Sequence, residues 1–304
     1  MRDVSTITPE SLPVTSWRAT LSAYLNLMKP HVTVLLLGVT LAAMVIASPT
    51  GLPSLGLIVA TLVGGALAAG SANAINCYCD RDIDQIMTRT QSRALPAHRV
   101  SETNALTFGV ALGVASFTLL TLAVNLLSAL LALAAILFYV FVYTRWLKRS
   151  TAQNIVIGGA AGAVPVLVGW AAVTNSLSLT PVWMFLIIYF WTPPHFWALS
   201  LVIKKDYERA GVPMLPVVAG EEETVKQIVL YTLMLLASTL VLFSLGAMGL
   251  LYLVAAVALG LGLLYLTIRL ARERTLKQAR TVFWFSNYYL VLIFAAMVID
   301  HALR

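Results

Sequence analysis

The sequence predicts an all-α protein that crosses a membrane nine times. Of its 304 residues, 60% are hydrophobic and only 11% are charged, and the mean hydropathy is +0.87. A soluble domain of this size does not tolerate so few charges. Nine apolar stretches are long enough, at about 18 to 24 residues, to span a bilayer as helices. They cover residues 30–48, 54–76, 104–123, 126–145, 155–174, 181–203, 227–246, 250–270 and 282–300.

The loops between these spans differ sharply in charge. The N-terminal tail and every second loop after it hold 19 of the 20 Lys and Arg residues, all but Arg304. Short loops rich in Lys and Arg stay in the cytoplasm, so we expect the N-terminus inside and the C-terminus outside. The same inner face holds 12 of the 13 Asp and Glu residues, all but Asp300. Mixed charge on one face indicates a site there.

Small residues and prolines recur inside three spans. Glycines in the second and fifth spans allow close contact between helices. They are Gly64, Gly65, Gly70, Gly158, Gly159 and Gly162. Prolines inside the fifth and sixth spans should kink those helices. They are Pro165, Pro193 and Pro194.

The two longest inner loops, 77–103 and 204–226, follow the second and the sixth spans. A separation of four helices puts both loops on the same side, as a parallel internal repeat requires. We therefore expect a site between two halves of one bundle. Residues 1–28 would form a cytoplasmic tail, and residues 29–304 a single nine-helix membrane domain.

The clearest chemical signal lies where the second span ends. Asn76, Asp80 and Asp84 are spaced four residues apart, and on a continuous helix such side chains lie along one face. An amide and two carboxylates would then converge at the membrane surface. Hard oxygen ligands of this kind suit Mg²⁺ that carries a phosphorylated substrate. Asp82, about 200° round the helix from Asp80, is expected to be solvated.

Several cations near this motif can bind phosphate. Arg89 and Arg93 follow in the same loop, and Lys148 follows the fourth span in the segment Tyr143-Thr-Arg-Trp-Leu-Lys. Each cation can hydrogen-bond phosphate oxygens. The positive-inside rule alone would also place basic residues at these positions, so both interpretations are open from the sequence.

A second polar group follows the sixth span, in Lys204-Lys205-Asp206-Tyr207-Glu208. Asp206 could supply a carboxylate to the same diphosphate from the opposite half of the protein. Its lysine neighbours, Lys205 among them, could equally neutralise it.

His195 lies within the sixth span, in Trp-Thr-Pro-Pro-His-Phe-Trp. A lone histidine in a span is commonly hydrogen-bonded to a neighbouring helix. The flanking prolines and aromatic residues would also suit a planar apolar ligand, and a neutral imidazole binds iron well.

Composition argues against several other functions. The net charge of +7 lies in loops beside the membrane rather than on a soluble surface, so it does not indicate nucleic-acid binding. Cys77 and Cys79 would point to different sides of a helix, which disfavours a disulfide or a metal site. The first 28 residues contain Asp3 and Glu10 and no apolar signal region. A bacterial cytoplasmic (inner) membrane is therefore expected.

Together these motifs resemble the intramembrane aromatic prenyltransferases of the ubiquinone-biosynthesis type, in which Asn-xxx-Asp-xxx-Asp ends the second of nine helices. The resemblance covers essentially the whole chain, and it is closer to the branch that farnesylates haem. The closer matches are residues 27–33, 76–96, 191–199, 206–216 and 279–290. The chain departs from the pattern at His31, where this branch commonly has Arg, and by having no carboxylate four residues after Asp206.

The resemblance implies Mg²⁺-dependent transfer of farnesyl from farnesyl diphosphate to the 2-vinyl group of haem b, giving haem O for terminal oxidases. The implied Mg²⁺ ligands are Asn76, Asp80, Asp84 and Asp206. The implied diphosphate cations are Arg89, Arg93 and Lys148. The implied haem-binding residues are His195, Tyr143 and Lys205. The implied partners are the lipid bilayer and a haem A synthase or a terminal oxidase assembly factor.

Two other functions are weighed against this one. A prenyltransferase acting on 4-hydroxybenzoate or another quinone precursor would use the same metal site with a pocket for an aromatic acid instead of a porphyrin. A transporter would also have nine spans, but it should hold polar groups near the middle of the bilayer. Here the polar groups cluster at one surface, which counts against transport.

Overall fold

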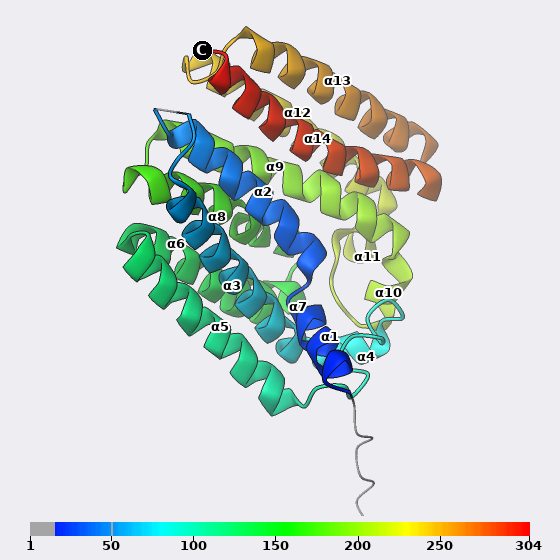
Figure 1. Ribbon diagram of the computed structural model, residues 1–304. Coiled ribbons are helices and arrows are strands. Elements are labelled where there is room, and N and C mark those ends of the chain that lie inside the picture. The colour runs from blue at the N-terminus through cyan, green and yellow to red at the C-terminus, as the bar shows by residue number, and fades with distance from the viewer. Residues whose placement is uncertain (1–15, 50) are drawn as a thin grey trace, which may run out of the picture.

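The computed structural model describes residues 16–49 and 51–304, and that part of the chain is helical with no strand (Figure 1). Nine helices in the described residues are long and apolar enough to cross a membrane. They are α2 (Pro30–Ala47), α3 (Leu55–Cys79), α5 (Glu102–Ala123), the helix Leu126–Ser150, α8 (Asn154–Thr174), α9 (Leu179–Val202), α12 (Gly220–Ser244), α13 (Leu250–Glu273) and α14 (Leu276–Ala302). The predicted all-α membrane class and its nine spans are confirmed.

The fourth spanning helix has three consecutive parts. It begins as α6 (Leu126–Leu137), continues as the π-helix η1 (Phe138–Leu147) and ends as α7 (Lys148–Ser150). π-helices are rare and occur frequently at functional sites. The sequence does not predict this π-helix, because apolar periodicity reveals a span and not its hydrogen-bonding pattern.

Four short helices complete the described chain. They are α1 (Trp17–Leu27), α4 (Arg81–Ile86), α10 (Lys204–Arg209) and α11 (Leu215–Val218). α1 falls within the segment assigned to a tail, and it buries Ala23 and Leu27. The other three lie in the two long charged loops, and each of those loops begins with a six-residue helix.

Several spans extend beyond the apolar runs that predicted them. α3 continues to Cys79, the fourth span to Ser150, and α12 and α14 begin at Gly220 and Leu276. The extra turns are polar or charged, and they stay helical because helix hydrogen bonding does not require an apolar side chain. These four extensions lie at the end of the bundle that carries α4 and α10, which holds most of the charged residues.

The helices pack so that α13 and α14 lie on one side of the bundle and α3 and α5 on the other, with α2, α8 and α9 between them (Figure 1). α2 and α8 approach so closely that a Cβ on Gly169 would collide with the carbonyl oxygen of Thr40. A Cβ on Gly158 would likewise collide with the ring of Tyr143. The predicted use of small residues for close contact is thus observed at Gly158. α8 and α9 both remain helical through their prolines.

Candidate active site

The polar site lies at the end of the bundle that carries α1, α4 and α10, opposite the C-terminus (Figure 1). The predicted continuous helix through Asn76, Asp80 and Asp84 is wrong in one respect. α3 ends at Cys79 and α4 begins at Arg81, because Asp80 adopts φ −95° and ψ 5°, outside the helical region. Backbone hydrogen bonds from Asp80 to Asn76 and from Asp84 to Asp80 still cross the break, at 2.9 and 2.8 Å.

Asn76 is the hub of a buried hydrogen-bond network. Its Oδ1 accepts a hydrogen bond from Nζ of Lys29 at 2.7 Å. Its Nδ2 donates to Oδ2 of Asp80 at 2.8 Å and to Oγ1 of Thr144 at 3.1 Å. The same Asp80 oxygen pairs with Nζ of Lys148 at 2.5 Å. Asn76 and Asp80 therefore converge as their spacing predicts. Lys148, predicted as a phosphate cation, pairs with Asp80, and Lys29 and Thr144 are additions that the sequence does not reveal.

The π-helix η1 positions one wall of this network. Oγ1 of Thr144 donates to the carbonyl oxygen of Tyr139, five residues earlier, at 2.8 Å. Thr144 thereby turns towards Asn76, while Lys148, one turn further on, reaches Asp80. Tyr143 stacks on Tyr139 with ring centroids 5.2 Å apart. Tyr143 thus contributes to the wall of the site through its ring.

Asp84 is buried and is paired with Arg93. Nη1 of Arg93 lies 2.9 and 2.7 Å from the two carboxylate oxygens. Burial is the largest single influence and opposes the charge of Arg93, but the neighbouring negative groups, Asp84 foremost among them, together raise the pKa of the guanidinium. Asp84 and Arg93 therefore form an ion pair beside the Asn76 network.

Asp206 joins the two long charged loops. It pairs with Arg209 at 2.5 Å and accepts a hydrogen bond from the backbone N–H of Arg89 at 3.3 Å. Arg209 also donates to Oγ1 of Thr88 at 3.0 Å. The two loops lie side by side, as expected for a site between two halves of the bundle. Arg89 contributes a backbone donor here, and its side chain is exposed.

The predicted Mg²⁺ ligands are not gathered into one cluster. Within residues 16–49 and 51–304, no three His, Cys, Asp or Glu side chains lie close enough together to hold a metal. Asp80, Asp84 and Asp206 each face a cation instead, and such pairing stabilises a buried carboxylate.

One carboxylate oxygen nevertheless fits a metal. Oδ1 of Asp80 is buried and has no hydrogen-bond partner, and Nη2 of Arg149 lies 3.8 Å from it. An unpaired buried carboxylate oxygen is costly unless a ligand uses it. Asp80 and the neighbouring amide oxygen of Asn76 are hard donors of the type that Mg²⁺ prefers. Asp84 and Asp206 could join them after releasing their arginines.

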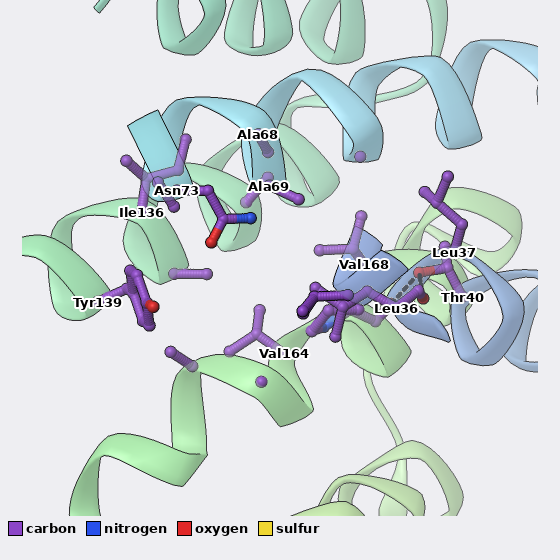
Figure 2. A pocket seen from close by; sticks show the side chains of 18 residues that line it. Leu36, Leu37, Thr40, Ala68, Ala69, Asn73, Ile136, Tyr139, Val164 and Val168 are labelled. Atoms are coloured by element: carbon purple, nitrogen blue, oxygen red, sulfur yellow. Dashed lines mark hydrogen bonds between the residues drawn. The ribbon is translucent and has the colours of Figure 1, made fainter. Parts of the chain in front are cut away.

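An apolar pocket of about 180 Å³ lies on the membrane side of this network (Figure 2). Residues of α2, α3, α6, η1 and α8 line it. Figure 2 shows Asn73 and Tyr139 at one end and Leu37, Thr40 and Val168 at the other. Tyr139 connects the pocket to the polar network, because its carbonyl oxygen accepts from Thr144. The lining of the pocket is almost wholly hydrocarbon, which suits an apolar chain.

Residues 36–292 match the UbiA prenyltransferase family. The chain belongs to the UbiA prenyltransferase family. It is 55% identical over 283 residues to the protoheme IX farnesyltransferase of Gloeobacter violaceus, covering 93% of this chain and 92% of the relative. It is 54% identical over 279 residues to that of Symbiobacterium thermophilum, covering 91% and 93%.

Solved structures of UbiA proteins share the fold. The chain is similar to digeranylgeranylglyceryl phosphate synthase with a TM-score of 0.78 and 18% identity, covering 94% of this chain and 99% of that one. It is similar to a UbiA homologue from Archaeoglobus fulgidus, bound to DMAPP and Mg²⁺, with a TM-score of 0.66 and 17% identity, covering 90% and 99%. At these identities the likeness establishes the shared fold.

His195 lies outside the polar network of this UbiA protein and is not among the residues that line the apolar pocket. Its ring is stacked between Trp191 and Phe283, with centroid separations of 4.2 and 4.7 Å. Its Nδ1 is 2.8 Å from Oγ of Ser286 on α14. The expected hydrogen bond to a neighbouring helix is thus present. Lys205, another of the three predicted haem-binding side chains, is exposed at the charged end of the bundle.

Asp82 is exposed, as predicted, but it is also paired. Both of its carboxylate oxygens accept from Arg149 at 2.7 Å. The hydrogen bonds to Arg149 are the main reason that the pKa of Asp82 falls to about 2. Arg149 also donates to the carbonyl oxygen of Cys79, so the pair braces the break between α3 and α4.

Lys29 and Thr144 are the main residues of the site that the sequence analysis missed. The charge pattern marks Lys29 only as one of the basic residues of the inner face. The signal that could have singled it out is its place before Pro30, at the start of a span, in a segment shared with the haem-farnesylating branch. Thr144 offers no comparable signal, because its position depends on the π-helix.

Proposed function

We propose that the protein transfers the farnesyl group of farnesyl diphosphate to the 2-vinyl group of haem b, giving haem O. The observation that carries the proposal is a buried polar network, centred on Asn76 and Asp80, at the mouth of an apolar pocket. The network suits a diphosphate and the pocket suits its isoprenoid chain. The identities of 55% and 54% to protoheme IX farnesyltransferases support haem b as the acceptor.

Lys29, Arg93 and Lys148 surround the place where the diphosphate would lie. Each now holds an oxygen of Asn76, Asp84 or Asp80, and each can move to a phosphate oxygen when substrate arrives. Mg²⁺ would be held by Asp80 and Asn76, joined by Asp84 and Asp206, and would supply charge neutralisation for the leaving diphosphate. The exposed side chain of Arg89 can reach the same anion from the loop.

The reaction balances with water as the third reactant. The bond between farnesyl C1 and the diphosphate oxygen breaks, and the electron pair leaves with the diphosphate. Tyr139, at the mouth of the pocket, presents an aromatic face that can stabilise the allylic cation. The vinyl group forms the new carbon–carbon bond, water adds to the resulting cation beside the porphyrin ring, and the added water loses a proton.

The membrane placement follows from charge and is part of the proposal. The charged end of the bundle would face the cytoplasm of a bacterial inner membrane, and the C-terminus would lie outside. Haem propionates would then face the basic loops, Lys205 among them. Because haem O is poorly soluble in water, a membrane partner such as a haem A synthase or a terminal oxidase assembly factor would accept it.

The test is incubation of purified protein with haem b, farnesyl diphosphate and Mg²⁺, followed by mass spectrometry of the porphyrin. We expect the mass of haem O with the wild type and with Asp82→Asn, and none with Asp80→Asn, which keeps the shape but removes the charge. Removal of Mg²⁺ with a chelator should abolish product, and added Mg²⁺ should restore it. Prenylation of a hydroxybenzoate instead of haem would overturn the choice of acceptor.

A further inference from the structure

The apolar pocket has a near end and a far end along the membrane normal. Its near end carries Asn73 and Tyr139, next to the polar network. At its far end, one residue from each of four helices lies well away from the charged end of the bundle. They are Thr40, Gly65, Ala132 and Val168. An isoprenoid with its diphosphate at Asp80 would therefore enter at Tyr139 and point towards Thr40.

The depth of the pocket matches a short isoprenoid. From Asn73 to Gly65 along α3, and from Val32 to Thr40 along α2, the pocket runs for eight residues, or about 12 Å at 1.5 Å per residue. One isoprene unit adds four chain bonds, at most about 6 Å for carbon–carbon bonds near 1.5 Å. The pocket thus accommodates about two units, with the first unit of the chain at the mouth.

The far end is fixed by contacts between backbones. The hydroxyl of Thr40 lies 2.8 Å from the carbonyl oxygen of Leu36 and 3.3 Å from that of Pro165 (Figure 2). The carbonyl oxygen of Thr40 packs against Gly169, where no side chain fits. Ser128 ties α6 to α8 by donating to the carbonyl oxygen of Val168 at 3.3 Å. These contacts hold α2, α6 and α8 together at the far end of the pocket.

We infer that the wall formed by Leu37, Thr40 and Val168 sets the length of the isoprenoid, limiting it to three units. This inference rests on the proposed function, because it assigns the pocket to the prenyl donor. Shortening the side chain of Val168 would enlarge the far end of the pocket. It would leave the contacts of the neighbouring backbone atoms in place. Gly65 is the position from which a new side chain fills the far end, since an added Cβ there meets only Leu37, at 3.4 Å.

The test compares geranyl, farnesyl and geranylgeranyl diphosphates on the full-length protein. The readouts are turnover with haem b and, separately, binding with Mg²⁺ by competition against a labelled farnesyl diphosphate analogue. We expect Val168→Ala to raise the preference for geranylgeranyl over farnesyl by about tenfold, as differences of a few carbons in an apolar pocket do. Gly65→Leu should raise the preference for geranyl over farnesyl by about tenfold.

The matched controls are the same two types of substitution at positions that do not line the pocket. Val114→Ala lies on the exposed surface of α5, and Gly56→Leu lies on α3 where an added Cβ has open space. Both should keep the wild-type length preferences. If both pocket variants bind farnesyl diphosphate with unchanged length preferences, the inference is wrong. A wild type that selects farnesyl in the binding assay but leaves haem unmodified would contradict the proposed acceptor and still support the length limit.

Discussion

Lys29 donates from Nζ to Oδ1 of Asn76 at 2.7 Å, from a position 47 residues earlier in the chain. Its backbone is left-handed, with φ 50° and ψ 64°, immediately before Pro30 begins α2. A residue other than glycine rarely adopts this conformation. This turn brings the ammonium group of Lys29 to Asn76, near the C-terminal end of α3. Burial at this position lowers the pKa of Lys29 below its usual range.

This relationship predicts that Lys29 serves the diphosphate. Lys29→Met should keep most of the aliphatic stem and lower kcat/KM by about 10²-fold, in the range for loss of one donor to developing negative charge. Lys29→Arg should retain more activity. The measurement is steady-state kinetics with farnesyl diphosphate varied. A loss confined to the haem KM would contradict this role.

Thr144 supports the site through the orientation of Asn76. Thr144→Val keeps the shape but removes the acceptor for Nδ2 of Asn76, leaving a buried donor without its second partner. An unsatisfied buried donor costs about 1–3 kcal/mol, so we expect Mg²⁺-dependent binding of inorganic diphosphate to weaken by about tenfold. Thr144→Ser keeps the hydroxyl and should bind normally. Equal binding by both variants would contradict the role.

The fold was accessible from the sequence because a bilayer imposes length, composition and charge asymmetry on each span. The contact between Asn76 and Asp80 was also accessible, since it follows from helical spacing. Lys29 was not, because its contact depends on a left-handed turn and on how α2 packs beside α3. Thr144 was missed because the π-helix changes which residues share a face.

The pairing of Asp84 and Asp206 illustrates a second limit of sequence analysis. Spacing indicated that carboxylates and cations share one surface, but it could not assign partners among them. The structure joins Asp84 to Arg93 and Asp206 to Arg209. These choices depend on the path of two long loops, whose turns are irregular.

The ion pair between Asp82 and Arg149 should make the free energy of unfolding depend on pH in the acidic range. The pKa of Asp82 falls from its usual 3.8 to about 2 in the folded protein, so its contribution is present above about pH 4 and is lost as the pH falls towards 2. Because the pair is largely exposed, the contribution should be about 1 kcal/mol or less. The free energy of unfolding in detergent should be larger for the wild type than for Asp82→Asn at pH 6, and the difference should shrink as the pH falls through about 2. A constant difference across this range would exclude the ion pair as its cause.

Nδ1 of His195 is hydrogen-bonded to Oγ of Ser286. The tautomer of His195 depends on whether this hydroxyl donates or accepts. Oγ of Ser286 lies 2.7 Å from the carbonyl oxygen of Phe283. With its hydrogen directed there it accepts from Nδ1–H of His195, and that tautomer leaves the lone pair on Nε2. A neutral imidazole with a free Nε2 can ligate haem iron. His195→Ala should therefore weaken haem b binding, followed by its Soret absorbance, much more than binding of farnesyl diphosphate. Ser286→Ala should shift the Soret band of bound haem with a smaller loss of affinity. Equal losses of both substrates in His195→Ala would show that the ring only packs between Trp191 and Phe283.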